Sequence, residues 1–319
     1  MPEDVETQLV LPAQRASSRP RAASGPAAGG PSRAPAALRA LRPRQWSKNL
    51  LVLGAPLAAG RVGDPEVLLG CAVAVVLFCA AASSVYLVND VADADRDRLH
   101  PTKRYRPIAA REIPPAVALA MAVVLGVGSV ALGLWWSVPL GGTLLVYLAV
   151  QAAYSGGLKH QPGLDLAVVS SGFLLRAVAG GTATDIVLSP WFLLVASFGS
   201  LFMVAGKRYS EIRRLGSGSE TRRSLQMYSE SYLRFIWTMA AGVTVVVYIL
   251  WALNGVQASD PLSWQLVSVA PFVLALLRYT ADVDRGTAES PEEIVLSDRH
   301  LQVVGAAWLV MLLLHAVLG

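Results

Sequence analysis

Charged residues are scarce in this sequence. They make up 15% of its 319 residues, against about 25% in an average soluble domain, and 54% of the residues are hydrophobic. So few charges cannot give a folded domain a water-soluble surface. The composition therefore excludes an ordinary soluble protein and indicates a membrane protein.

Several reactive groups are also few or wrongly spaced. Cys71 and Cys79 fall in one apolar stretch, too far apart along a helix to form a disulfide and without the spacing of a metal site. The four histidines show no ligand spacing, and no Ser–His–Asp pattern or glycine-rich phosphate loop is present. These absences argue against a disulfide framework, a zinc centre and a nucleophilic triad.

Long apolar stretches are what the sequence has in abundance. Most of them approach the ~20 residues that a helix needs to cross a bilayer. The windows are 49–60, 66–88, 113–135, 138–154, 165–181, 190–206, 235–254, 263–279 and 301–318. They predict an all-α, polytopic membrane protein with about nine transmembrane helices. The first window is short and contains Pro56, so its helix is extended back to about Trp46.

Basic residues gather in alternate loops. Of the 27 Lys and Arg residues, only Arg61 falls in the other set of loops, and only Arg176 falls in the middle of an apolar window, since Arg278 lies at the end of one. Because cytoplasmic loops keep the positive charge, the N-terminus and the basic loops are predicted to be cytoplasmic. With nine spans, the C-terminus is then outside, and a multi-pass protein of the plasma membrane is expected.

The first forty residues differ from the rest of the chain. They are rich in Ala, Pro, Ser, Gly and Arg, which predicts a disordered basic tail over 1–40 and a transmembrane domain over 41–319. The net charge of +5 comes largely from this tail and the cytoplasmic loops. It argues for a membrane surface and phosphate ligands, and against nucleic acid. The sequence leaves the oligomeric state open, a homo-oligomer included.

Carboxylates are concentrated at the end of the second apolar window. Asn89, Asp93 and Asp97 follow at intervals of four residues, and Asp90 shares their helix face. Crowded carboxylates at a helix C-terminus repel one another and oppose the helix dipole, so something positive must offset them. Oxygen ligands suit Mg²⁺, which takes one or two carboxylates plus substrate phosphates. We predict that these four residues bind Mg²⁺ and that the three aspartates are catalytic.

Basic residues follow the aspartates at once. Lys103, Arg104 and Arg106 lie close enough in sequence to a carboxylate cluster to hold phosphate oxygens beside it. A metal and cations together imply a polyphosphate ligand. Two alternatives remain: ordinary positive-inside topology for the basic residues, and a solvated acidic helix end neutralised by Arg96 and Arg98.

Three further segments on the same predicted side carry similar residues. They are Arg-Pro-Arg-Gln-Trp-Ser-Lys-Asn at 42–49, Tyr-Ser-Gly-Gly-Leu-Lys at 154–159 and Gly-Lys-Arg-Tyr-Ser-Glu at 206–211. They add the candidate phosphate-binding residues Lys48, Lys159, Lys207 and Arg208. Other candidate site residues are Asn49, Tyr86, Tyr154, Asp165, Arg176 and Glu211. Snorkelling explains Lys159 and Lys207 equally well, and Arg176 fits a role in binding helices together equally well.

A family resemblance rests on three motifs. They are Asn-Asp-x-x-Asp-x-x-x-Asp at 89–97, Arg-Pro-Ile at 106–108, and Tyr-Ser-x-x-Leu-Lys with a downstream Asp at 154–165. The chain from about residue 40 to its end resembles the UbiA superfamily of intramembrane prenyltransferases. That likeness implies nine spans around a cytoplasmic-side cavity. The segments 42–49, 86–93 and 206–211 look most like the actinobacterial decaprenyl-phosphate phosphoribosyltransferases.

One departure distinguishes branches of that superfamily. Ordinary members carry a second Asp-rich motif after span six, used with the first to bind a prenyl diphosphate through two magnesium sites. The corresponding place here has Lys207, Arg208 and Glu211, which argues for a phosphate held directly by cations. The resemblance then implies transfer of a 5-phosphoribosyl group from phosphoribosyl pyrophosphate to decaprenyl phosphate, for arabinose donors of cell-wall polysaccharides.

The resemblance also implies roles for the basic residues. Those at 103–106 and 207–208 would hold the donor's phosphates, and Lys48 or Lys159 would hold the acceptor's. Two other functions stay open. One is a UbiA-type enzyme that moves a prenyl group from prenyl diphosphate to an aromatic acceptor or haem, and the other is a cation-coupled transporter. The roles of the tail and of residues 280–300 are not indicated by the sequence.

Overall fold

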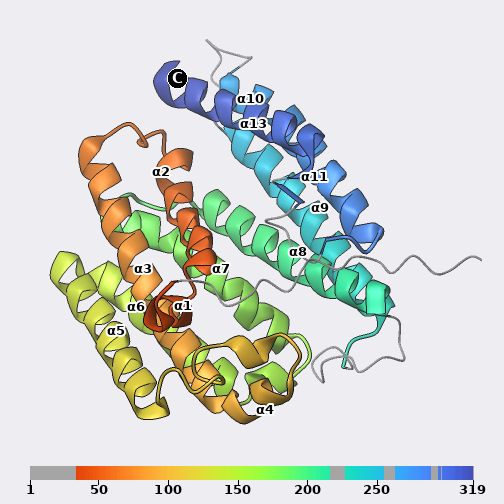
Figure 1. Cartoon of the computed structure of the whole chain (residues 1–319). Helices are drawn as coiled ribbons and strands as arrows, with labels where there is room; N and C mark the ends of the chain where they lie inside the picture. Colours follow the sequence, from red (N-terminus) through yellow and green to blue (C-terminus); the bar gives the residue numbers. More distant parts are fainter. Residues whose placement is uncertain (1–33, 216–226, 255–262, 289–293, 296, 319) are drawn as a thin grey trace, which may run out of the picture. The chain divides into compact units, whose positions relative to one another are not determined.

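All regular elements in the described part of the chain are helices (Figure 1). The structure is a computed structural model, and it describes residues 34–215, 227–254, 263–288, 294–295 and 297–318. In a bilayer no water is present to satisfy backbone N–H and C=O groups, so only helices and closed barrels can cross it. The predicted all-α class is confirmed.

Eight helices of the described residues are long and apolar enough to cross a membrane. They are α3 (Pro65–Ala92), α5 (Pro115–Trp136), α6 (Val138–Gly156), α7 (Leu164–Thr184), α8 (Pro190–Leu215), α9 (Glu230–Asn254), α10 (Trp264–Val267) continued by α11 (Val269–Asp284), and α13 (Arg299–Leu318). Shorter helices are α1 (Ala36–Ala40), α4 (Ala94–Leu99), and the 3₁₀ helices η2 (Lys103–Tyr105) and η3 (Leu158–His160). The eight correspond to the second to ninth predicted windows. The protein is a multi-pass membrane protein.

The first predicted span is not a regular α-helix, so the nine-span count is not confirmed. Its place is taken by the 3₁₀ helix η1 (Pro43–Leu53, 11 residues) and by α2 (Gly54–Ala58, 5 residues). Runs of 3₁₀ helix longer than three or four residues are uncommon. At about 2.0 Å per residue in η1 and 1.5 Å in α2, the segment still covers about 30 Å, the thickness of a bilayer core.

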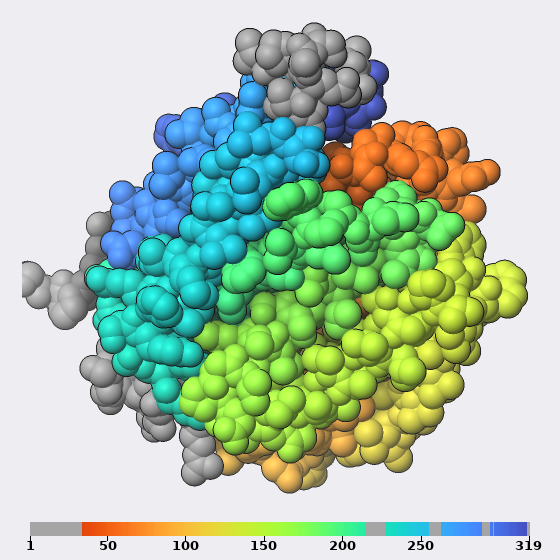
Figure 2. Space-filling model, turned by 180° about the vertical axis from the view of Figure 1, so that it is seen from behind, coloured from red at the N-terminus to blue at the C-terminus, as the bar shows by residue number. Residues whose placement is uncertain are grey.

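Neighbouring helices in the sequence are also neighbours in space. Contacts join α3 to α5, α5 to α6, α6 to α7, α7 to α8 and α8 to α9, and the last helix, α13, contacts both α11 and α2. Figure 2 shows the yellow to green helices α5–α8 followed by the cyan and blue helices α9 and α11. The segment η1–α2 packs on α7 and η1 also on α3, which places the start of the described chain among these helices.

Buried apolar side chains form three clusters. One lies where α7, α8, α9 and α11 meet and includes Phe202 and Trp237. A second joins η1, α3, α6 and α7 around Phe78, and a third packs α1, the end of α3 and the start of α5 around Ile108. These clusters fix the ends of α3, α6, α7 and α8, which carry the candidate site residues.

The predicted boundary at residue 40 differs from the structure. Residues 1–33 lie outside the described residues. The compact unit begins at Ala34, and α1 occupies the last five positions of the predicted tail with Ala40 1% exposed. Ala40 is buried because it packs in the third apolar cluster with Ile108. The tail prediction therefore extends several residues too far.

Candidate active site

The acidic cluster lies at a break between two helices. Asp93 ends α3 and begins α4, with φ −97° and ψ 1°, so the chain turns where the sequence predicts one continuous helix face. Asp90 on α3 and Asp97 on α4 still come together, because Arg106 Nη1 donates to both carboxylates at 3.1 and 2.6 Å. Both aspartates are buried, at 3% and 4% exposure. The core of the predicted site is thus a pair of buried carboxylates that share one cation.

A second arginine reaches the same pair from the N-terminal segment. Arg42 forms an ion pair with Asp90, and its guanidinium lies 4.9 Å from the centre of the Tyr86 ring. Its backbone is left-handed, with φ 55° and ψ 60°, directly before Pro43. Two buried carboxylates would repel each other strongly in a medium of low dielectric constant. The two guanidiniums offset that repulsion.

Asp93 and Asp95 are in a different environment. Asp93 forms an ion pair with Arg96 at 2.6 Å and its side chain is 41% exposed. The Asp95 side chain is 93% exposed and pairs with Arg98. The alternative of a solvated, self-neutralised acidic helix end therefore describes these two residues, while Asp90 and Asp97 are held by Arg42 and Arg106.

A second polar group joins α6, α7 and α8. Asp165, near the start of α7, is fully buried and accepts a hydrogen bond from Tyr154 Oη at 2.9 Å. Arg208 of α8 lies 3.3 Å from the same carboxylate and 3.6 Å from Glu211. Just before α7, the backbone N–H of Gly163 donates to the hydroxyl of Tyr228 at 3.0 Å.

Tyr228 helps to fix the start of α7. Burial raises the pKa of its phenol above the ordinary value, so the hydroxyl is neutral at pH 7. The residue is 7% exposed. Its bond to Gly163 holds the turn from which Asp165 enters the helix bundle.

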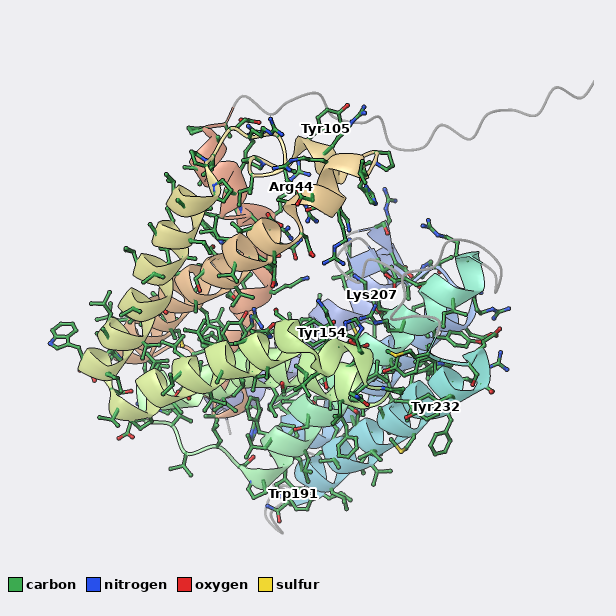
Figure 3. All side chains as sticks on the ribbon, turned by 90° about the horizontal axis from the view of Figure 1, so that it is seen from below. Arg44, Tyr105, Tyr154, Trp191, Lys207 and Tyr232 are labelled. Carbon is green, nitrogen blue, oxygen red and sulfur yellow. The ribbon has the colours of Figure 1, made fainter. Side chains whose placement is uncertain are left out.

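The two polar groups are connected. Ser155 Oγ of α6 donates to Asn89 Oδ1 of α3 at 2.8 Å, and Ser155 follows Tyr154 in the chain. Figure 3 shows Tyr154 and Lys207 on one side of this region and Arg44 and Tyr105 on the other. The ends of α3, α6, α7 and α8 thus contribute polar side chains to one region.

The chemistry of the donor atoms suits a hard divalent cation. Asn89, Asp90 and Asp97 offer only oxygen, and two carboxylates with substrate phosphates are a common set for Mg²⁺. Within the part of the chain that the structure describes, no three His, Cys, Asp or Glu side chains are placed to hold one metal ion. Arg106 lies between Asp90 and Asp97 instead. The predicted set of four ligands is therefore not assembled, and the residues fit a site with few protein ligands.

Comparison with known proteins identifies the family. The model of the UbiA prenyltransferase family matches residues 50–298. The chain belongs to this family. It is 51% identical over 284 residues to the decaprenyl-phosphate phosphoribosyltransferase of Mycolicibacterium smegmatis, covering 85% of this chain and 89% of that protein. It is 53% identical over 278 residues to the protein of that name from Mycobacterium tuberculosis H37Rv, covering 85% and 91%.

A solved structure has the same fold. The UbiA homologue from Archaeoglobus fulgidus bound to DMAPP and Mg²⁺ matches with a TM-score of 0.67, covering 88% of this chain and 99% of that one, at 15% sequence identity. At this identity the likeness concerns the fold of the UbiA family alone.

In this UbiA-family chain the end of α8 is basic and firmly held. Tyr209 is fully buried, and its hydroxyl accepts a hydrogen bond from Arg234 Nη2 at 2.7 Å. This contact ties α8 to α9 beside Lys207 and Arg208. Lys207 has no hydrogen bond or ion pair with another described residue, and Figure 3 shows it on the same side of this region as Tyr154.

The remaining predicted phosphate-binding residues differ in exposure and in their contacts. Arg104 is exposed and donates to the hydroxyl of Tyr105 at 2.8 Å, and no contact joins it to the aspartates. Lys48 on η1, Lys103 on η2 and Lys159 on η3 are all partly exposed. Arg106 and Arg208 form direct ion pairs with buried acids.

Two predicted candidates lie away from the acidic cluster, and two contributors were missed. Arg176 and Asn49 bind each other inside the bundle at 2.7 Å. Arg42 and Ser155 were not predicted, although Arg42 opens the 42–49 motif and Ser155 is the second residue of the 154–159 motif. Both residues therefore lie within motifs that the sequence analysis had selected. The sequence did not indicate their partners, because Arg42 and Asp90, for example, are 48 positions apart.

Proposed function

We propose that this protein transfers the 5-phosphoribosyl group of phosphoribosyl pyrophosphate to decaprenyl phosphate and releases pyrophosphate. The main support is 50–53% identity over 85% of the chain with proteins named decaprenyl-phosphate phosphoribosyltransferase. The place where ordinary family members have a second Asp-rich motif carries Lys207 and Arg208 here. Extra cations suit a reaction in which both substrates carry phosphate.

The observation that carries the proposed mechanism is the shared Arg106 contact with Asp90 and Asp97. Both carboxylates are buried and both are neutralised by arginine. The arginines could therefore exchange the carboxylates for an anionic ligand, and the carboxylates could exchange the arginines for a cation. The guanidiniums of Arg42 and Arg106 would turn to the pyrophosphate oxygens of the donor, and the freed carboxylates would hold Mg²⁺ with Asn89. When bound, Mg²⁺ supplies positive charge to the pyrophosphate leaving group.

The reaction needs no proton transfer. A phosphate oxygen of the acceptor forms a bond to the anomeric carbon while the bond from that carbon to pyrophosphate breaks, and the electron pair leaves with pyrophosphate. The acceptor phosphate is already ionised at neutral pH. Arg42 and Arg106 would stabilise the charge that develops on the leaving oxygen.

The donor would span both polar groups, and the acceptor would bind at separate cations. The donor's pyrophosphate would lie at Arg42 and Arg106, beside the buried aspartates. Lys207 and Arg208 would hold the donor's remaining phosphate, and Lys48 or Lys159 the phosphate of the lipid acceptor. Apolar side chains exposed on the outer helix faces, such as Val123 and Val124 of α5, face the bilayer in which the acceptor's tail would lie.

The orientation follows from the charge of the loops. The ends of α3, α6 and α8 that carry the site also carry the basic loops, so this side would face the cytoplasm. The segment η1–α2 runs from Arg42, at the acidic cluster, toward the opposite ends of α3 and α7. It would act as a ninth crossing of the plasma membrane, with the N-terminus inside and the C-terminus outside.

A transfer assay tests the proposed function. The purified protein is given Mg²⁺ and decaprenyl phosphate with labelled phosphoribosyl pyrophosphate, or labelled prenyl diphosphate with an aromatic acceptor. We expect label from the ribosyl donor in the lipid fraction, and no such transfer in the presence of a chelator. Reaction of the prenyl donor alone would overturn the proposed substrates and favour an ordinary prenyltransferase. Reaction of neither donor would favour a transporter.

A further inference from the structure

Arg176 is a buried cation in the middle of α7. Its side chain is 6% exposed, and it lies eleven residues, or about 16 Å of helix, beyond Asp165. A phosphate held near Asp165 at the start of α7 is therefore out of its reach. A charged side chain in the middle of a membrane-spanning helix costs free energy, and such residues usually have a structural or functional role.

The partners of Arg176 are uncharged, and apart from the backbone oxygen of Gly172 in α7 itself they come from other elements. Its Nε donates to Asn49 Oδ1 at 2.7 Å, and its Nη2 donates to the hydroxyl of Tyr147 at 3.2 Å. The guanidinium also lies 5.0 Å from the centre of the Tyr147 ring and 5.7 Å from that of Phe78. One planar group thus contacts η1, α6 and α3 at once. Lysine has neither the planar shape nor enough directed donors to replace it.

Asn49 receives this contact on η1. It is fully buried, and its Nδ2 donates to Cys79 Sγ at 3.1 Å. Close by, a Cβ atom on Gly180 would lie 2.0 Å from the backbone oxygen of Val52. The backbones of η1 and α7 therefore touch, and the position of η1 along α7 is fixed by these contacts.

The start of η1 is attached to α3. Trp46 Nε1 donates to Ser83 Oγ at 3.2 Å, and Ser83 Oγ donates to the backbone oxygen of Leu41 at 2.9 Å. Leu41 is followed by Arg42, which reaches Asp90. A long 3₁₀ helix has poorer hydrogen-bond geometry than an α-helix, so contacts with its neighbours must determine where its first residue lies.

We infer that the Asn49–Arg176 pair is a positioning element that sets η1 against α7 and thereby holds Arg42 at the buried carboxylates. Arg176 touches no substrate in this arrangement; it acts through Arg42. The inference rests on the role proposed above for Arg42 in binding the donor. Loss of the pair would let η1 shift and would weaken donor binding more than the chemical step.

A crosslinking experiment measures the position of Arg42 without relying on activity. Arg42→Cys and Tyr86→Cys are combined, and a short bifunctional thiol reagent joins them. Each single-cysteine variant, which keeps native Cys71 and Cys79, gives the background. Adding Arg176→Lys is expected to lower the specific yield at least threefold, while Arg61→Lys, at an exposed arginine paired with Asp64, leaves it unchanged. An unchanged yield in the Arg176→Lys background overturns the inference.

Kinetics test whether the effect passes through Arg42. We expect Arg176→Lys to raise the KM for the ribosyl donor about tenfold and to change kcat less than threefold. In an Arg42→Ala background, Arg176→Lys should raise the KM for the ribosyl donor by less than a further twofold, because the effects of coupled residues are not additive. If the KM increase of the double variant equals the product of the two single increases, the inference is overturned. Asn49→Ala provides a second disruption if Arg176→Lys does not fold. If Arg42→Ala alone leaves the KM unchanged, the proposed donor site fails, while the crosslink still decides the positioning role.

Discussion

Removal of the Arg106 side chain takes the shared cation from two buried carboxylates. In the structure Arg106 Nη1 lies 3.1 Å from Asp90 and 2.6 Å from Asp97, whose side chains are 4% and 5% exposed. Arg106→Ala leaves this negative charge in a region with little water. The variant should therefore be less stable than the wild type and should respond more strongly to added cations.

The size of the effect follows from the geometry. Breaking a buried ion pair by removing one partner costs about 3–5 kcal/mol. Here Asp90 keeps Arg42, and the Arg106 side chain is 28% exposed, so we expect a loss of about 2 kcal/mol. For a chain of this size, that corresponds to a decrease in Tm of about 3 °C. The loss of a charged donor at the leaving group should lower kcat/KM by about 100-fold.

The assay is thermal unfolding in detergent micelles, with and without millimolar Mg²⁺. Because the variant has vacant carboxylates where the wild type has Arg106, Mg²⁺ should raise its Tm more than that of the wild type. Arg96→Ala is the matched control, since Arg96 is 77% exposed and pairs with a partly exposed aspartate. An unchanged Tm for Arg106→Ala, with no greater response to Mg²⁺, would refute the reasoning.

Three further predictions concern the site. Asp90→Asn should lower kcat at least 100-fold, whereas Asp95→Asn, at a side chain that is 93% exposed, should change it less than twofold; equal effects would show that burial does not identify the functional carboxylates. Tyr154→Phe removes one hydrogen bond to Asp165 but leaves Arg208 in place, so we expect a loss of about tenfold or less in kcat/KM, and a larger loss would mean that the hydroxyl touches substrate. A chelator should abolish transfer and added Mg²⁺ should restore it; activity that persists after exhaustive chelation would exclude a role for the metal.

Some features of the site were predictable because they are local in sequence. Asp90 and Asp97 lie seven residues apart and are followed within ten residues by Arg106, so one short stretch of chain supplies both carboxylates and their shared cation. The break at Asp93 was not predictable. At this break Asp93 and Asp95 lie toward solvent, while Ala94 packs in the apolar cluster around Ile108.

The first predicted span shows the limit of hydropathy. The window 49–60 is apolar enough to suggest a helix, but hydropathy does not distinguish an α-helix from the 3₁₀ winding of η1. That winding accompanies the contact between Val52 and Gly180 and the buried bond between Asn49 and Arg176, which are 127 positions apart. Such contacts depend on which helices meet, and no local pattern encodes them.

The sequence by itself determined the helical membrane architecture, because a bilayer requires long apolar segments whose backbone groups are satisfied internally. It also determined the carboxylates at the end of α3 and the cations that follow them. Only the tertiary structure decided the pairings: Arg42 with Asp90, Ser155 with Asn89 and Arg208 with Asp165. Each joins residues on different helices, so it depends on the packing of whole helices and on the burial that makes an unpaired charge costly.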